Sequence, residues 1–141
     1  MQVEWSTIES IAKTEAIDLW ILFPLGVAVN RLLRRNGPPP ESQAKALTRI
    51  FGTEDWQEAF YPQRTVRTLF GEEEMQIKEA DFDKIGQYFV DRLKTVFTKV
   101  ADNPLPLLNS RNNPLYLLCF AAGNPRGADT AVKIAQNILR R

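Results

Sequence analysis

Apolar residues dominate one short stretch near the start of the chain, residues 17–23 (IDLWILF), in which Asp18 is the only polar side chain. The run has the length of a strand, and Pro24 ends it. Because its apolar residues follow one another without alternation, the pattern predicts a strand covered on both faces, as in the parallel sheet of an α/β protein. A membrane span needs about 20 apolar residues, and Pro24 and Gly26 interrupt this stretch, so we predict no membrane contact.

Spacings of three and four residues predict helices elsewhere. The clearest set begins at Phe82 and continues to Val100, with Asp81 as a candidate N-cap. Ser6 and Glu9 have the spacing of a capping box, which predicts a helix over residues 7–13. Further helices are expected over residues 27–35, over 41–51 up to Gly52, and over 129–140, where the predicted inward residues are Ala131, Ile134, Ala135 and Ile138.

Turn residues separate these elements. NGPPP at 36–40 predicts a break, GEEE at 71–74 a solvated loop, and SRNNP at 110–114 a short connection between strands over 105–109 and 115–122. The order is helix, strand, several helices, strand, strand, helix. We therefore predict one α/β domain over residues 1–141 with helices on the faces of an incomplete sheet of about three strands.

Composition removes several classes of chemistry. The formal charge of +1 gives no overall attraction to nucleic acid or an anionic membrane, and the absence of histidine excludes histidine-dependent triads, dyads and zinc sites within the chain. Cys119 lies in an apolar run and is expected to be buried, while Glu72, Glu73 and Glu74 are consecutive, so their side chains diverge. No catalytic, cofactor-binding or metal-ligating residue is predicted. No signal peptide is visible, so we expect a cytoplasmic protein.

Three longer segments resemble the C-terminal part of the three-Cys-motif partner family (TcmP), bacterial proteins with a class I methyltransferase-like, Rossmann-type fold. They are VEWSTIESIAKTEAIDLWILFPLGVAVNRLLRR, FGTEDWQEAFY and NPLYLLCFAAGNPRGADTAVKIAQNIL. The resemblance implies that the strand from Leu19 to Phe23 is the fifth strand of a larger sheet and that the two later strands are its sixth and seventh.

The same resemblance implies that the glycine-rich turn for S-adenosylmethionine belongs to a preceding N-terminal half of such proteins. The seven glycines of this chain are scattered singly and form no G-x-G-x-x-G turn. We therefore expect no cofactor in this chain and no catalysis by it alone, although a full-length relative would use S-adenosylmethionine. The strand from Leu19 to Phe23 would be left with an unpaired edge, which predicts self-association or pairing with the missing N-terminal part.

Ligands of open α/β sheets bind beyond the carboxyl ends of the parallel strands. On the methyltransferase interpretation, this rule gives the substrate-side candidates Pro24, Gly26, Asn30, Arg31, Asn109, Arg111 and Asn112. The asparagines have a simpler interpretation as turn formers and caps.

A second hypothesis is a stand-alone module that binds protein or nucleic acid. Its candidate surfaces are the exposed strand edge and a basic patch formed by Arg31, Arg34, Arg35, Lys45 and Arg49. Because acidic residues such as Glu41 are interspersed, the basic residues also fit an ordinary solvated helix face. An independent enzyme is disfavoured because the chain lacks histidine, a cofactor loop and clustered carboxylates.

Overall fold

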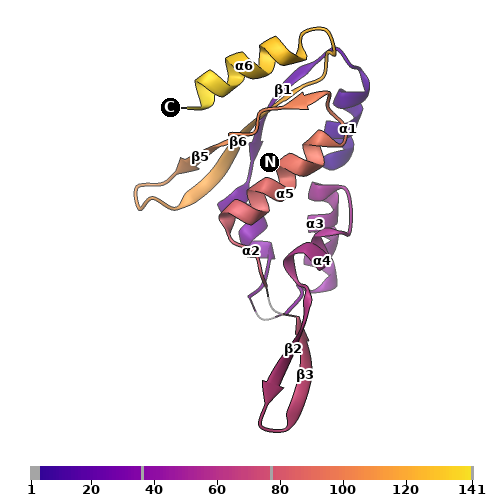
Figure 1. Cartoon of the computed structure of the whole chain (residues 1–141), viewed down its shortest axis with the longest axis vertical. Coiled ribbons are helices and arrows are strands. Elements are labelled where there is room, and N and C mark those ends of the chain that lie inside the picture. The colour runs from indigo at the N-terminus through magenta and orange to yellow at the C-terminus, as the bar shows by residue number, and fades with distance from the viewer. Residues whose placement is uncertain (1–3, 36, 77, 141) are drawn as a thin grey trace.

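A computed structural model describes residues 4–35, 37–76 and 78–140 as a mixed α/β structure with six α-helices and two antiparallel sheets (Figure 1). The helices are α1 (Trp5–Lys13), α2 (Asn30–Leu32), α3 (Glu41–Phe51), α4 (Trp56–Phe60), α5 (Phe82–Lys94) and α6 (Ala128–Leu139), and a π-helical turn, η1 (Leu25–Val29), precedes α2. The strands are β1 (Asp18–Phe23), β2 (Gln63–Thr68), β3 (Gly71–Gln76), β4 (Lys99–Val100), β5 (Leu105–Leu108) and β6 (Pro114–Ala122). Asn36, in the predicted break, lies outside the described residues.

The main sheet is built around β6. Strand β1 pairs with one side of β6 in the register Asp18↔Ala122 to Phe23↔Leu117, and β4 and β5 pair with its other side. All of these pairs are antiparallel, so the expected parallel pairing is wrong. The two predicted later strands do form a hairpin, β5–β6, and the two-residue strand β4 makes the sheet four-stranded instead of about three-stranded.

The two faces of β6 carry two separate cores. Leu117, Cys119 and Ala121 face the larger core, which α1, α3, α4 and α5 cover, and where Phe23 stacks on Phe89 at a ring separation of 4.1 Å. Phe120 and the other residues of the opposite face pack against α6 in the smaller core. Helices therefore cover both faces of β6, as predicted for the sheet.

Strand β1 is covered on one face only. Ile21 and Phe23 are buried in the larger core, whereas Trp20 and Leu22 point to the other face and remain 42% and 47% exposed. The prediction of a strand buried on both faces is therefore wrong for β1. The physical reason is that α6 packs on β6 and β4 and does not extend over β1.

Helix α6 shows the same departure from the prediction. Its buried residues are Ala128, Val132, Ala135 and Leu139, while the predicted inward residues Ile134 and Ile138 are 57% and 43% exposed. Asp129 and Gln136, on the opposite flank of the helix, bond to Lys99 and Asp102 at and just after β4. Ile134 and Ile138 therefore lie on the flank directed away from β4, toward the β1 side of the sheet.

Three further predictions are corrected in the helical regions. Helix α1 begins at Trp5, whose side chain is buried, so Ser6 lies inside the helix and forms no capping box. The helix predicted over 27–35 is instead η1 and α2, because the Pro24 carbonyl accepts the Val29 N–H five residues later. Helix α5 is capped by Asp81 as predicted, but it ends at Lys94, and Val100 belongs to β4.

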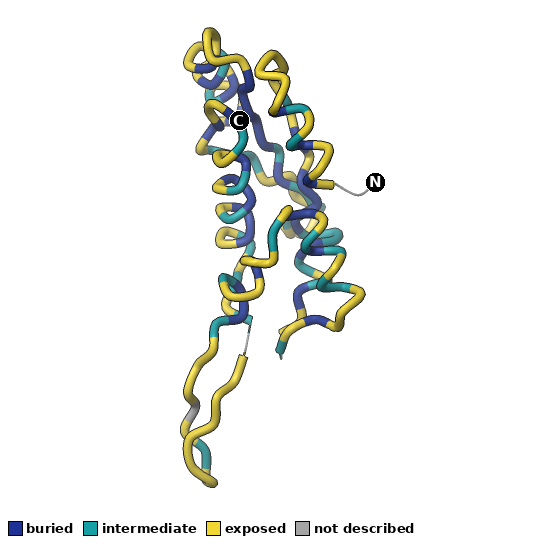
Figure 2. Tube along the Cα trace, turned by 90° about the vertical axis from the view of Figure 1, so that its right-hand side faces the viewer, coloured by how far each residue is buried: buried dark blue, intermediate teal, exposed yellow. Residues whose placement is uncertain are grey.

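A long hairpin arm formed by β2 and β3 projects from one end of the molecule (Figure 1). The segment 71–74 was predicted to be a loop, and it forms most of β3 instead. The expectation that it is solvated is confirmed, because every residue of β3 is exposed (Figure 2). At the base of the arm, the Arg64 guanidinium forms two hydrogen bonds with the Glu79 carboxylate, at 3.0 and 2.8 Å.

Candidate functional site

The two turns that the sequence assigns to the substrate side lie at the same end of the main sheet. The β1 residue Phe23 pairs with Leu117, and the β5 residue Leu108 pairs with Pro114, so both strands run toward the start of β6. Gly26 packs so closely against the backbone of Pro114 that an added Cβ would collide with its carbonyl oxygen. Pro24 and Gly26 therefore lie beside the end of the β5–β6 hairpin.

The connection between β5 and β6 is held by Asn109. Its side-chain oxygen accepts the backbone N–H groups of Arg111, at 2.9 Å, and Asn113, at 3.0 Å. Asn112 takes a left-handed backbone conformation with φ of 61°, which asparagine tolerates better than most residues. The Asn109 oxygen is thus used in the turn, while the Arg111 and Asn112 side chains are exposed to solvent.

Asn30 and Arg31 do not join this turn. The Asn30 side-chain oxygen accepts a 2.6 Å hydrogen bond from Lys78, which lies at the base of the β2–β3 arm, and Arg31 is exposed. Burial lowers the pKa of Lys78, and the nearby Arg35 lowers it further. The seven predicted residues are therefore divided between the hairpin end of the sheet and the base of the arm.

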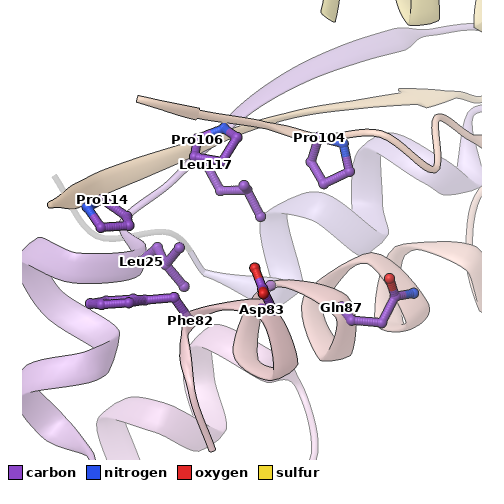
Figure 3. Close-up of a pocket in the computed structure, with 9 residues that line it drawn as sticks. Leu25, Phe82, Asp83, Gln87, Pro104, Pro106, Pro114 and Leu117 are labelled. Carbon is purple, nitrogen blue, oxygen red and sulfur yellow. The ribbon is translucent and has the colours of Figure 1, made fainter. Parts of the chain in front are cut away.

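An apolar cleft of about 300 Å³ lies between α5 and the β5–β6 hairpin (Figure 3). Among the described residues that line it, the only ionisable side chain is that of Asp83, which projects from α5 toward the strands. Gln87 lies one turn further along the helix. Three prolines line the strand side of the cleft, and because proline has no backbone N–H, this side offers few hydrogen-bond donors. The cleft is lined by Leu25, Phe82, Asp83, Gly86, Gln87, Pro104, Pro106, Pro114 and Leu117.

Sequence reasoning did not identify this cleft. Its residues come from η1, α5, both strands of the hairpin and the connection before β5 (Pro104), and none of them belongs to a recognisable motif. The one local signal is the spacing of Pro104, Pro106 and Pro114 around the hairpin. Gly86 permits α5 to approach the sheet, because a Cβ there would lie 2.9 Å from Leu117 Cδ2.

The described side chains provide neither a cluster for a metal ion nor an accessible nucleophilic cysteine. Within residues 4–35, 37–76 and 78–140, no three His, Cys, Asp or Glu side chains are arranged to hold a metal ion. Cys119 is buried in the larger core, and burial raises the pKa of its thiol to about 12, so it is not a reactive nucleophile. What the cleft offers is an apolar surface with one carboxylate at its wall.

A second candidate surface is the free side of β1. In the described part of the chain, β1 pairs with β6 alone, so its other edge carries unpaired backbone donors and acceptors. We use the name β1-side patch for four exposed apolar residues, namely Trp20 and Leu22 on this strand and Ile134 and Ile138 on α6. Together they leave large apolar side chains exposed next to an unpaired strand.

Comparisons of the chain with protein-family models, with curated proteins and with solved structures find no significant match. None of the described helices has the length and apolar character needed to cross a membrane. The geometry of the sheet edge, the cleft and the arm therefore supplies the functional argument.

Proposed function

We propose that this chain is the C-terminal, substrate-side portion of a three-Cys-motif partner (TcmP-like) methyltransferase-like protein, and that it is not catalytic alone. In this proposal a complementary α/β segment adds a strand to the free edge of β1 and covers the β1-side patch. That segment carries the S-adenosylmethionine site.

The main support for the proposal is a group of four apolar side chains that the sequence pattern predicts to be buried and that are exposed in the structure. All four residues are exposed on the face of the sheet that α6 covers. They are Trp20 and Leu22 on β1 and Ile134 and Ile138 on α6. Full burial of a side chain of this kind contributes about 1.5–3 kcal/mol. A strand on the free edge with a helix above it would bury this patch and satisfy the unpaired backbone groups.

The strand order gives further support. On the assignment implied by the resemblance, β1 is the fifth strand and β5 and β6 are the sixth and seventh. β6 lies between β1 and β5 and runs antiparallel to both, so β1 and β5 run in the same direction. Their carboxyl ends then lie on one side, where the rule for open α/β sheets puts the substrate.

The proposal is tested by supplying the cofactor-binding half of a three-Cys-motif partner protein in trans. We expect a complex that binds S-adenosylmethionine in calorimetry, while the chain alone releases no binding heat. Trp20→Lys together with Leu22→Lys should abolish the complex. Leu108→Lys, a change at an equally exposed apolar residue of β5, is the matched control and should leave it intact. Binding of S-adenosylmethionine by the chain alone would contradict the proposal.

A further inference from the structure

The tip of the β2–β3 arm exposes two apolar side chains almost completely. Leu69 and Phe70 join the two strands, and their exposed fractions are 100% and 94%. The connection between β2 and β3 is the free end of the arm in Figures 1 and 2. The arm projects away from both cores, so neither side chain contributes to the packing of its own chain.

The turn itself does not require these residues. Thr68 accepts the Phe70 N–H and donates to the Gly71 carbonyl oxygen, and Gly71 adopts the positive φ of 115° that the turn needs. The two central positions are usually polar or turn-forming residues in such hairpins. Because neither the turn nor the core uses Leu69 and Phe70, their apolar character points to a contact with another molecule.

Charge along the arm restricts what that molecule is. Glu72, Glu73 and Glu74 follow the tip on β3, and no basic side chain among the described residues lies within 4 Å of their carboxylates. Strand β2 carries Arg64, which is bound to Glu79, and Arg67, which lies opposite Glu72, so the three carboxylates outnumber the one remaining arginine. This negative balance disfavours nucleic acid and anionic lipid. They favour a protein surface that combines an apolar pocket with nearby basic groups.

This chain carries such a surface. Arg31, Arg34 and Arg35 are exposed at and just after α2, and the Arg35 carbonyl accepts the N–H of Lys78 at the base of the arm. The apolar cleft begins at Leu25 of η1, which directly precedes α2. A six-residue strand spans about 20 Å, so Glu72 next to the tip and these arginines lie at opposite ends of the arm of one chain, while Glu74 lies about midway along it. A second copy in the reverse orientation brings the two groups together.

We propose that two copies of the chain exchange their β2–β3 arms reciprocally. Leu69 and Phe70 of one copy enter the apolar cleft of the other, between α5 and Pro106. Glu72 and Glu74, which share one face of β3, lie against Arg31, Arg34 and Arg35 of the other copy, and Arg67 beside the tip pairs with its Asp83. The exchange is two-fold symmetric, so it closes at a dimer. The arm and cleft are separate from the β1 edge, so this inference does not depend on the proposed function.

Disulfide trapping tests the contact directly. The double variant Phe70→Cys with Pro106→Cys, made in the Trp20→Lys, Leu22→Lys background that blocks the β1 edge, should form a covalent dimer under mild oxidation. Phe70→Cys with Ile134→Cys is the matched control, because Ile134 is exposed on α6 outside the cleft, and it should remain monomeric on a non-reducing gel. The native Cys119 is buried and takes no part.

Sedimentation in the same background measures the energetics. Phe70→Asp should raise the dimer dissociation constant at least tenfold. It should leave the thermal unfolding unchanged when both chains are dilute enough to be monomeric. Met75→Gln, at a partly exposed apolar residue of the same arm, should leave the dimer unchanged. Reversal of Glu72 and Glu74 to lysine should weaken the dimer, and reversal of Arg31, Arg34 and Arg35 to glutamate in that variant should restore it. A chain that stays monomeric through the micromolar range, or equal trapping with the control pair, would overturn the proposal.

Discussion

Trp20 and Phe120 lie opposite each other in the β1–β6 ladder, with their ring centroids 4.7 Å apart. Phe120 is buried under α6, whereas Trp20 keeps 42% of its surface exposed. The boundary of the smaller core therefore passes between two neighbouring aromatic rings. The Trp20 side chain is therefore held in place by Phe120, and its exposed part is available for contact with another molecule.

This relationship predicts a clear difference between the two faces of β1. Trp20→Thr should lower the free energy of unfolding by about 1–2 kcal/mol, because the partly exposed ring loses its contact with Phe120 while threonine still suits a strand. Phe23→Ala, at the fully buried residue stacked on Phe89, should cost about 3–5 kcal/mol. Urea unfolding of both variants checks this. Equal losses would mean that the outer face of β1 is covered in the isolated chain.

Gly26 is predicted to be intolerant of any side chain. An added Cβ would collide with the carbonyl oxygen of Pro114, which is backbone and cannot move aside without shifting the β5–β6 hairpin. Gly26→Ala should therefore lower the free energy of unfolding by about 1–3 kcal/mol. Gly127→Ala is the matched control, because a Cβ there meets no atom within 4 Å. A stable Gly26→Ala chain would show that η1 moves freely relative to the hairpin.

The sequence was informative where one local rule determined the structure. Asp81 caps α5, and Gly52, with a left-handed φ of 72°, ends α3, because short-range hydrogen bonds and backbone conformation decide both. The buried thiol of Cys119 was also predictable from its apolar run. These features depend on residues within a few positions of each other.

Prediction failed where the outcome depends on which element lies alongside another. The apolar run of β1 indicates residues that favour burial, but it does not say whether a second layer is present to cover Trp20. Periodicity gave Ile134 as an inward residue of α6, yet the hydrogen bonds of Gln136 and Asn103 at the β4 end orient the helix differently. The cleft is a product of tertiary packing, so no local pattern could identify Asp83 as its one charged group.

Cys119 is expected to resist thiol reagents in the folded chain. Burial raises the pKa of its thiol from 9.0 to about 12, so the reactive thiolate is almost absent near pH 8, and the side chain is also enclosed. A colorimetric thiol assay should detect no free thiol in native protein and one thiol per chain after addition of denaturant. Rapid labelling without denaturant would show that the centre of β6 opens readily.

Tyr61 makes a prediction about alkaline stability. Burial raises the pKa of its hydroxyl from 10.0 to about 12, although the positive charge of Arg34 acts in the opposite direction. The folded chain therefore keeps a proton that the unfolded chain loses above pH 10, so the free energy of unfolding should fall as the pH rises from 10 toward 12. Below pH 10 both states hold the proton, and this group adds no pH dependence.

Tyr61→Phe separates this effect from the hydrogen bond that the hydroxyl donates to the Arg34 carbonyl oxygen at 2.6 Å. The variant should lose about 1 kcal/mol at neutral pH, because that bond is absent. It should also lose less stability than the parent chain between pH 10 and 12, because the buried phenol no longer titrates. Tyr116→Phe controls for removal of a tyrosine hydroxyl from the β5–β6 hairpin. Urea unfolding measures the free energy of unfolding of both chains between pH 10 and 12. If it falls equally steeply with pH in Tyr61→Phe and in the parent, the buried hydroxyl is not the group responsible. The connection between α4 and β2 is then open to solvent at high pH.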